Sequence, residues 1–515
     1  MRGYLFVAAS IAVFCYLVLR NQADQRRDEA FAAQRHCAPP PRWAARWPFG
    51  LDLLVKAFVH ARRQTILQFF LEVTDSSGTT HEQSLLGARG INTMEPKNLE
   101  AVLSKQFEDF DLGLRPLHFA PLMGKGIFTQ DGADWKHSRE LLRPQFASNR
   151  YQNFEEVKDC VESLLAQIKP DTPIDLQPLF FRLTFDTTTF LLFGETMSSL
   201  QSSTIASQES EFARAFNLSQ EYLSHRGRLG LFYWLMNPPE FRRACRVTHR
   251  FVDAAVQQAL DKSSATPHQA HDEKERSSYV FIDALVQQTR DKRFLRDQCI
   301  NVLLAGRDTT ACCLTWTIRL LVRHPHVLAK LRAEIESVIE VGSNAPHPKR
   351  DDLRKMPYLA IVLKEVLRLY PSVPVNSRAA IRTTTLPVGG GPTGESPILV
   401  RKGEAVGYCV YAMHRRKDLY GEDALVFRPE RWEDDKLKNI GYGYLPFNGG
   451  PRICLGQEFA MLEAGYTIVR MLQRFPVMHW PEGERVEEVG KEKQTLTLVV
   501  ASGDGCRVVF SEHGK

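Results

Sequence analysis

The sequence has no C-x-x-C pair and no regular cysteine spacing, although it contains 10 cysteines in 515 residues. This spacing argues against a disulfide framework. We expect most of these cysteines to be reduced, buried and small apolar side chains. Reduced cysteines are typical of the cytosol, so we expect the main part of the chain to lie there.

Several signatures of catalysis and nucleotide binding are also missing. The chain has neither a G-x-S-x-G sequence nor a Walker phosphate loop, and HEQSL at position 81 fails the H-E-x-x-H pattern. GGGPTG, residues 389–394, satisfies G-x-G-x-x-G, but strand-like runs flank it and no helical pattern follows. We interpret it as a hairpin turn. Because no flavin or nicotinamide domain is evident, any electrons the protein uses must come from another protein.

A strong excess of one charge sign is absent as well. The formal net charge is +6, with 43% hydrophobic and 24% charged residues, which is the composition of a globular protein. So small a charge argues against dedicated nucleic-acid binding and suits an anionic membrane surface or an acidic partner. The length allows one large core or two to three ordinary domains.

The longest run without charge lies at the N-terminus. Tyr4–Leu19 is almost entirely apolar and is flanked by Arg2 and Arg20. It is short for a helix that needs about 20 residues to span a bilayer, and a cleaved signal peptide is the alternative, although no small-residue cleavage site follows. We predict an uncleaved transmembrane anchor. The arginines that follow it predict that the body of the protein stays on the cytosolic side.

The anchor is followed by a proline-containing stretch. Pro39–Pro41 should form a stiff, extended spacer. The predicted organisation is therefore an anchor over residues 1–20, a linker over residues 21–50 and one large domain over residues 51–515.

The large domain is predicted to be mainly helical. Helical periodicity is clear in five segments: LLVKAFVHARRQTILQFFLEV (residues 53–73), Glu155–Ile168, Leu179–Phe193, Glu240–Leu260 and Val327–Val338. Strand-like patches are fewer and shorter: Leu386–Val388, Ile398–Val400, Leu496–Val500 and Val508–Phe510. The segment 294–324 is apolar nearly all round in its middle, so we expect a long helix through the centre of the fold. The pattern favours a helix-rich domain with small sheets.

The stretch FNGGPRICLG, residues 447–456, carries the most specific pattern in the chain. A lone cysteine is usually only a buried apolar residue. Here, however, Phe447, Gly450, Arg452, Cys454 and Gly456 fit F-x-x-G-x-R-x-C-x-G. The pattern resembles the thiolate loop of the cytochrome P450 family. The resemblance implies a mainly α fold with small β-sheets, a helix-rich triangular prism around a buried haem b whose iron is bound by Cys454.

The other residues of this loop have roles that the resemblance implies. Gly450 permits the tight turn, Gly456 permits close approach to the ring, Arg452 pairs with a haem propionate, and Phe447 keeps water from the sulfur. A thiolate ligand pushes electron density into haem iron and favours O–O cleavage. The helical run 457–473 places the positive end of a helix beside the sulfur, which favours the thiolate.

Further motifs of the same family occur along the chain. KEVLR gives Glu365 and Arg368 on one helix face, and FRPERW gives Arg431. The resemblance implies that these three form a buried cluster behind the haem. The alternative for Glu365 and Arg368 is an exposed helix salt bridge, which is worth little.

Two more motifs are similar to propionate-contacting positions of the family. WKHSR places Trp135 and Arg139 on one helix face, and PSVPVNSR supplies Arg378. The resemblance implies that all three contact the haem. The alternative for both arginines is ordinary surface charge.

AGRDTT, residues 305–310, resembles the oxygen-activation segment of the family. The resemblance implies that Gly306 leaves room above the iron, and that Asp308 and Thr309 deliver protons to dioxygen. An acid beside a hydroxyl suits that task, because O–O cleavage needs protons in a dry site. The alternative is a packing notch at Gly306 with threonines bonded back to their own helix.

Five longer stretches indicate a particular subgroup of the family: WKHSRELLRPQF, AGRDTTA, TTTLPVGGGPTGESPILV, YGEDALVFRPERW and FNGGPRICLGQEFA. They are similar to fungal membrane-bound enzymes that hydroxylate alkanes and fatty acids. The resemblance implies a monooxygenase of the endoplasmic reticulum membrane, with a single span, that receives electrons from NADPH through a cytochrome P450 reductase. Its expected substrate is an n-alkane or a fatty acid, oxidised at or near the terminal carbon.

Other functions stay open at this point. The enzyme could oxidise a different lipid or a secondary metabolite. A haem-thiolate isomerase or dehydratase, which needs neither O2 nor a reductase, is a second alternative, and a non-enzymatic haem or lipid carrier is a third. We expect residues 110–128, residues 216–236 and the central helix to line the substrate pocket, where Arg115 or Arg226 could hold a carboxylate.

Overall fold

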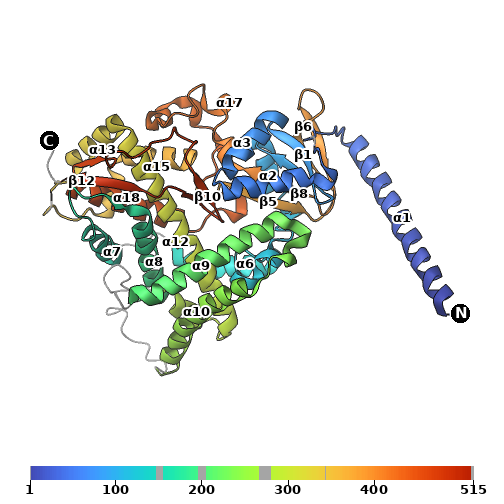
Figure 1. The fold of residues 1–515 in the computed structure, drawn as a ribbon, viewed down its shortest axis with the longest axis horizontal. Helices are drawn as coiled ribbons and strands as arrows, with labels where there is room; N and C mark the ends of the chain where they lie inside the picture. The colour runs from blue at the N-terminus through green and yellow to red at the C-terminus, as the bar shows by residue number, and fades with distance from the viewer. Residues whose placement is uncertain are drawn as a thin grey trace. The chain divides into compact units, whose positions relative to one another are not determined.

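The computed structural model describes residues 2–43, 45–146, 155–194, 205–265, 280–342 and 344–511. These residues form two compact units (Figure 1). The smaller unit comprises residues 1–53, 72–113 and 377–409, and the larger unit comprises residues 54–71, 114–376 and 410–515.

The secondary structure is mostly helical, as the sequence predicts. The α-helices are α1 (Arg2–Gln34), α2 (Leu51–Arg62), α3 (Ile66–Ser77), α4 (Pro96–Glu100), α5 (Arg115–Met123), α6 (Gly132–Leu142), α7 (Glu155–Leu165), α8 (Leu176–Phe193), α9 (Ile205–Leu229), α10 (Pro239–Ala265), α11 (Phe281–Val286), α12 (Lys292–Arg323), α13 (Pro325–Val338), α14 (Arg350–Arg354), α15 (Pro357–Leu369), α16 (Val410–Met413), α17 (Lys417–Tyr420) and α18 (Gln457–Arg474). The strands are β1 (Thr80–Leu85), β2 (Ala88–Thr93), β3 (Phe110–Asp111), β4 (Ile174–Asp175), β5 (Val375–Ala380), β6 (Thr384–Gly390), β7 (Ser396–Val400), β8 (Ala405–Cys409), β9 (Val477–His479), β10 (Gln494–Leu496), β11 (Val500–Ser502) and β12 (Arg507–Ser511).

The smaller unit is built on a five-stranded sheet with the order β1-β2-β8-β5-β3. β1 and β2 form a tight hairpin that turns at Leu86 and Gly87, both with positive φ, and β8 pairs parallel to β2. β6 and β7 form a second, antiparallel hairpin. The GGGPTG stretch lies at its turn, so the prediction of a hairpin in place of a dinucleotide loop is confirmed.

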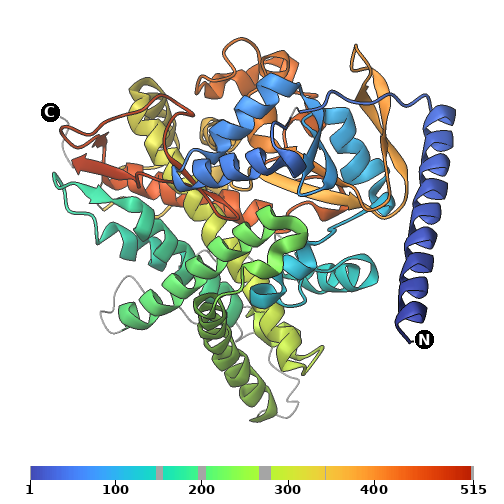
Figure 2. The same ribbon diagram turned by 45° about the vertical axis from the view of Figure 1, so that its right-hand side comes forward.

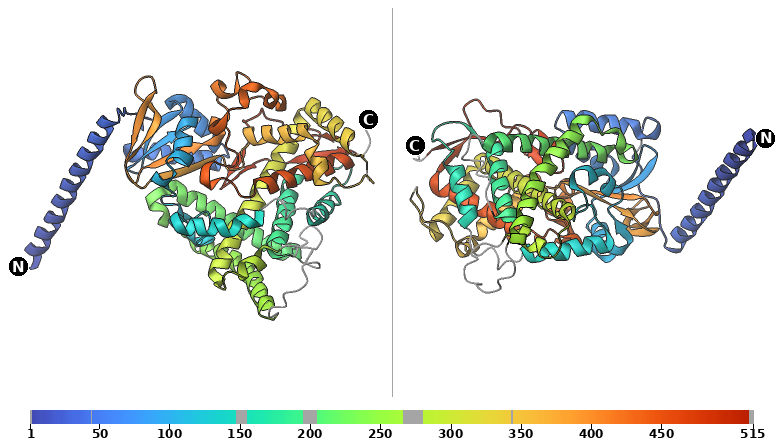
Figure 3. Two further views of the ribbon diagram at one scale, coloured as in Figure 1. Left: turned by 180° about the vertical axis from the view of Figure 1, so that it is seen from behind. Right: turned by 90° about the horizontal axis from the view of Figure 1, so that it is seen from below.

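The N-terminal helix belongs to the smaller unit and is one uninterrupted helix (Figure 3). It contains the expected anchor Tyr4–Leu19 and continues to Gln34, into the expected linker. The side chains of residues 2–5, 7–9 and 17 lie outside the described set. Within the described part of the chain, no helix is both long enough and apolar enough to cross a membrane. The transmembrane anchor is therefore not confirmed and stays a prediction.

The larger unit is organised around α12, which contacts α8, α10, α15 and α18. Figure 2 shows α12 in yellow-green, running between the other helices of this unit. Asp291 caps its first turn by accepting hydrogen bonds from the backbone N–H groups of Arg293 and Phe294. The predicted central helix is thus confirmed, and its observed bounds differ by only a few residues from those predicted. Leu295, Ile300 and Leu303 on α12 belong to a large buried apolar cluster.

Candidate active site

The cysteine loop folds back on itself in the larger unit. The backbone N–H of Cys454 donates to the carbonyl of Phe447 at 3.0 Å, and the N–H of Ile453 donates to the carbonyl of Gly450 at 3.0 Å. Gly450 has φ +66°, a conformation that side chains disfavour, so glycine is needed for this turn. Asn448 also has a positive φ, which asparagine tolerates better than most residues.

Cys454 lies directly before α18, whose N-cap is Gly456. Its side chain is exposed to solvent, yet burial by surrounding atoms raises the pKa of the thiol. The Cys454 thiol is thus reachable by solvent although many protein atoms lie around it, as is expected for a side chain that lines a concave site. The backbone N–H of Gly456 donates to the sulfur and, with the charge of Arg139, acts to lower this pKa. These two groups would stabilise a thiolate once a cation is bound to the sulfur.

α6 is joined to the cysteine loop through Trp135 and two arginines. The guanidinium of Arg139 lies 5.9 Å from the Trp135 ring centre and that of Arg452 lies 4.3 Å from it. Arg139 donates to the carbonyl of Ile453 at 3.0 Å. Arg452 donates to the carboxylate of Asp131 at 2.6 Å. The expected propionate contacts of these residues stay predictions, and Asp131 is a partner of Arg452 that the motif did not reveal.

The middle of α12 is buried except for one stripe. Every residue from Asp297 to Val322 is buried apart from Ala305, Gly306 and Thr309, which lie on one side of the helix. The Thr309 hydroxyl donates to the carbonyl of Ala305 at 2.6 Å. A Cβ on Gly306 would come within 2.5 Å of the Thr188 hydroxyl on α8. The absence of a side chain at Gly306 therefore lets α12 and α8 pack closely. Thr309 is the residue of the accessible stripe that carries a hydroxyl group.

Asp308, next to Thr309 in the sequence, is buried and is bound in an ion pair. Its carboxylate accepts from its neighbour Arg307 at 2.7 Å, and both side chains are buried. Burial raises the pKa of Asp308, while the charge of Arg307 and a hydrogen bond from Gln220 act to lower it. Arg307 and Gln220 are site residues that sequence reasoning missed.

Glu463 on α18 is a second buried acid that the motifs did not reveal. It is 1% exposed, and the hydroxyl of Thr187 on α8 and the side chain of Thr310 on α12 hydrogen-bond to its carboxyl group. Burial raises the pKa of Glu463 to about 7, although both threonines act to lower it. Its only sequence signal is an acid within an otherwise apolar run of α18.

Replacing Glu463 with glutamine should change how stability depends on pH. A carboxyl whose pKa rises from 4.5 to about 7 on folding stabilises the folded state at low pH, and that contribution is lost as the pH rises through 7. The wild-type free energy of unfolding, relative to that of Glu463→Gln, should therefore fall by about 3 kcal/mol over this range. Urea unfolding of both proteins at several pH values measures it. Parallel pH curves for the two proteins would contradict the assignment.

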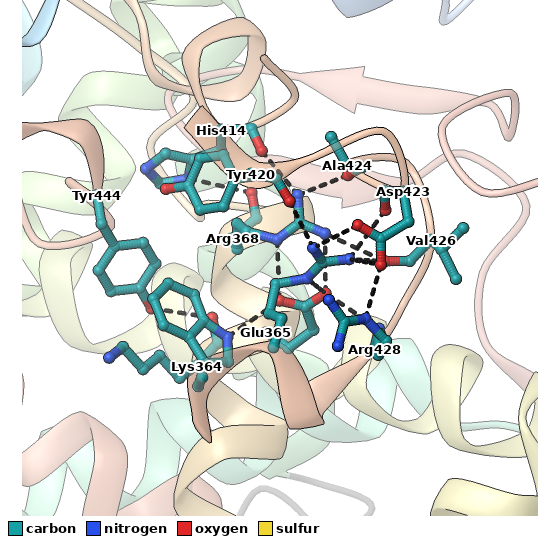
Figure 4. A network of polar contacts seen from close by, with 12 residues as sticks. Lys364, Glu365, Arg368, His414, Tyr420, Asp423, Ala424, Val426, Arg428 and Tyr444 are labelled. Carbon is teal, nitrogen blue, oxygen red and sulfur yellow. Dashed lines mark hydrogen bonds and ion pairs between the residues drawn. The ribbon is translucent and has the colours of Figure 1, made fainter. Parts of the chain in front are cut away.

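The structure brings Glu365, Arg368 and Arg431 together in a buried cluster. Figure 4 shows this network, with Glu365 and Arg368 labelled. Arg368 binds the two carboxylate oxygens of Glu365 at 2.9 Å and 2.8 Å, and Arg431 binds one of them at 2.8 Å. The three side chains are at most 1% exposed. The alternative of an exposed helix salt bridge is therefore wrong for Glu365 and Arg368.

The remaining nitrogens of the two arginines bind backbone carbonyls of the segment before Arg431. Arg368 donates to the carbonyls of His414 and Ala424, each at 2.7 Å. Arg431 donates to the carbonyls of Tyr420 and Val426 at 3.0 Å and 2.9 Å. The cluster thus fixes an irregular segment that has little regular secondary structure of its own.

Three other arginines were predicted to bind a haem propionate or a substrate carboxylate, and the structure places each of them among protein partners. Arg378 is buried on β5 in the smaller unit, so its expected haem contact stays a prediction. Arg115 donates to the side chain of Asn376. Arg226 is buried and donates to backbone carbonyls of residues 117, 118, 233 and 236. Because its donors are engaged in this way, Arg226 ties the end of α9 to α5, and it does not offer a free carboxylate site.

Comparison with known proteins gives matches along the whole chain. The model of the family described as "Cytochrome P450" matches residues 41–500. A cytochrome P450 of Arthroderma benhamiae is 60% identical over 100% of both chains. Cytochrome P450 52A5 of Candida maltosa is 44% identical over 84% of both chains. Cytochrome P450 monooxygenase g430 of a Fusarium species is 40% identical, over 96% of this chain and 88% of that protein.

Proposed function

Because the chain belongs to the cytochrome P450 family of haem monooxygenases, we propose that it hydroxylates long-chain n-alkanes or fatty acids at the terminal carbon. The overall change is R–H + O2 + NADPH + H⁺ → R–OH + H2O + NADP⁺. The observation that carries the substrate class is the resemblance of five long stretches to fungal alkane and fatty-acid hydroxylases. The accessible stripe of α12 is compatible with it, since Ala305, Gly306 and Thr309 carry no charge.

The residues of the cysteine loop fit a haem. Cys454 offers an accessible sulfur that accepts the Gly456 N–H, and Gly450 provides the turn before it. Cys454 would hold the iron, and Arg139 and Trp135 lie on the adjoining α6. A haem bound there would supply the activation of dioxygen.

The remaining groups would exclude water, position the substrate and move protons. Phe119 and Ile127 are partly buried apolar side chains that pack against the large buried apolar cluster, and they would contact an alkyl chain. Thr309 presents its hydroxyl at the accessible stripe. Asp308, one residue before it, would hold the proton that this hydroxyl passes on.

We propose NADPH-cytochrome P450 reductase as the electron donor. Lys136, Arg143, Lys436 and Lys438 are exposed. Basic side chains in the regions of α6 and residues 435–438 would suit an acidic docking surface on the reductase.

We propose attachment to the endoplasmic reticulum membrane, for which two features provide support. The sequence Tyr4–Leu19 carries no charge. In the larger unit, the 3-10 helix η6 (Gly230–Leu235) exposes large apolar side chains, among them Leu231 and Trp234, which are 59% and 60% exposed. Exposed groups of this kind are typical of interaction or membrane surfaces.

One experiment tests substrate, donor and location together. The full chain is expressed with the reductase, cells are fractionated, and the membranes are incubated with NADPH, O2 enriched in oxygen-18, and dodecane, hexadecane or hexadecanoic acid. We expect the protein in the membrane fraction and terminal alcohols that carry one labelled oxygen, detected by mass spectrometry.

Each contradicting result has a distinct meaning. Label-free products formed without NADPH would contradict a monooxygenase and favour an isomerase or dehydratase. Labelled products only from other lipids would contradict the substrate class alone. Protein in the supernatant would contradict membrane attachment alone.

A further inference from the structure

The two segments predicted to line the substrate pocket, residues 110–128 and 216–236, carry several cationic side chains. Some of them are bound to protein groups or are exposed to solvent: Arg115, His118, Lys125 and Arg226. His225 and Arg228 remain, and they lie three residues apart near the end of α9. These two side chains are the remaining candidates for binding an anionic ligand.

Arg228 is a cation without an acid partner. Among the described residues it forms no ion pair, and its guanidinium donates to three neutral acceptors. They are the Ser224 hydroxyl at 3.1 Å, Nδ1 of His225 at 3.0 Å and the backbone carbonyl of Leu496 at 3.2 Å. Burial lowers the pKa of Arg228, and the charge of Glu221, which is exposed, acts to raise it. A half-buried guanidinium with neutral partners favours the binding of an anion.

One donor of the guanidinium is available to such an anion. Nε of Arg228 has no hydrogen-bond partner among the described residues, and this atom is not buried. The three bonds made by the other two nitrogens fix the orientation of the group. A planar guanidinium held in this way is well suited to a carboxylate, which it binds through charge-assisted hydrogen bonds.

Apolar groups lie beside this cation. His225 stacks on Phe58 of α2, with the ring centres 5.5 Å apart. Leu496 on β10 and Leu498 after it are half-buried. Leu498 packs against the apolar cluster that includes Leu303 of α12. A ligand with a charged end and an alkyl chain therefore finds a partner for each part.

The β10–β11 hairpin connects the surroundings of Arg228 to the accessible stripe of α12. Leu496, whose carbonyl binds Arg228, is paired with Val500 on β11. The backbone N–H of Val500 donates to the carbonyl of Ser372 at 3.0 Å. The Ser372 hydroxyl donates to the carbonyl of Thr309 at 2.9 Å. The cation and the reaction site are thus held by one continuous set of contacts.

α9 sets the distance between Arg228 and the reaction site. Gln220 hydrogen-bonds to Asp308, the neighbour of Thr309, and Arg228 follows Gln220 by eight residues on the same helix. Eight residues of α-helix advance about 12 Å. An extended alkyl chain advances about 1.25 Å for each C–C bond of about 1.5 Å, so about ten carbons span this distance. The spacing therefore suits a long-chain carboxylate.

We propose that Arg228, oriented by His225 and Ser224, binds the carboxylate of a long-chain fatty acid whose other end lies at the accessible stripe of α12. The carboxylate gives Arg228 the anion that the described fold does not supply. It also holds the chain with its terminal carbon near Thr309. An alkane lacks this contact and is bound by apolar contacts alone. The inference rests on the proposed function, and it makes fatty acids the preferred substrates.

Binding of the fatty acid provides the first test and needs no catalysis. Equilibrium dialysis of the detergent-solubilised, haem-loaded full chain against radiolabelled hexadecanoate measures the dissociation constant. In Arg228→Met this constant should rise about ten- to hundredfold, because a charge-assisted pair is lost. Arg228→Lys keeps the charge without the planar fork, so its constant should lie between the two. Equal binding by wild type and Arg228→Met would overturn the proposal.

The second test separates recognition from folding. Arg228 lies in the last turn of α9, where a basic residue stabilises the helix end whatever else it binds. In Arg228→Met, KM for hexadecanoate should rise about ten- to hundredfold with kcat little changed. KM and kcat for hexadecane, which has the same chain length and no carboxylate, should be unchanged. Equal losses with the two substrates would show a structural role and overturn the proposal.

A matched control and two further outcomes complete the experiment. Arg250 is exposed on α10, so Arg250→Met should leave both KM values unchanged. A rise for hexadecanoate equal to that in Arg228→Met would show a general effect of charge and contradict the proposal. If hexadecanoate binding depends on Arg228 but neither substrate is oxidised, the carboxylate site stands and the proposed hydroxylation fails. If wild type oxidises hexadecane but does not bind hexadecanoate, the carboxylate site fails and the hydroxylation stands.

Discussion

Cys454→Ser protein should lose the long-wavelength absorbance of its reduced carbon-monoxide complex, and its monooxygenase activity should fall to background. The serine hydroxyl is far less acidic than a thiol, so it remains protonated where cysteine forms a thiolate ligand. The electron donation that favours O–O cleavage then disappears. Absorbance spectra and haem content of the purified full chain measure the effect.

A second cysteine provides the control for this substitution. Cys245 is buried on α10, and its thiol already donates to the Ser219 hydroxyl at 3.8 Å. A serine hydroxyl can occupy that polar position, so Cys245→Ser should keep the absorbance band. If the band persisted in Cys454→Ser, another residue would have to be the ligand, and the site built around residues 447–456 would be wrong.

Glu365→Gln should lower the free energy of unfolding by about 3–5 kcal/mol, because it leaves the buried charges of Arg368 and Arg431 without their anion. The amide oxygen can still accept hydrogen bonds, but the neutral amide cannot compensate the charges of two guanidinium groups. Trp432 also donates to Glu365 at 3.0 Å, and the backbone N–H of Arg428 does so at 3.1 Å. Urea unfolding followed by circular dichroism measures the loss.

An exposed pair with the same helical spacing is the natural comparison. Asp351 and Arg354 on α14 lie 3.3 Å apart, and their side chains are 79% and 63% exposed. Asp351→Asn should change the unfolding free energy by less than about 0.5 kcal/mol. Similar losses in the two variants would show that the cluster contributes no more than a surface salt bridge.

The sequence predicted those structural features that depend on residues close together in the chain. The length and apolarity of residues 294–324 predicted α12, and the glycines between two strand-like runs predicted the β6–β7 hairpin. The spacing of Glu365 and Arg368 predicted their contact, since residues three apart meet on one helix face. Their burial followed only from the family resemblance.

Features that depend on distant segments could not be predicted from spacing. Arg307 and Asp308 are adjacent in sequence, and adjacent residues on a helix do not normally face each other. They pair here because Phe181 and Phe216 enclose the guanidinium. Arg452 has Asp131 as a partner some 321 residues earlier in the chain. Glu463 gave only a weak signal, an acid within an apolar run, and its threonine partners could not be predicted because they lie on α8 and α12.

The long sequence separations within the Glu365 cluster constrain the order in which the protein can fold during synthesis. Arg431 and the carbonyl of Ala424 follow their partners on α15 by 66 and 56 residues. Until that segment has left the ribosome, Glu365 and Arg368 on α15 lack these partners, and burying their charged side chains without them would cost free energy. We therefore expect α15 to pack late in folding. A chain that is truncated before residue 424 should be unable to bury this helix.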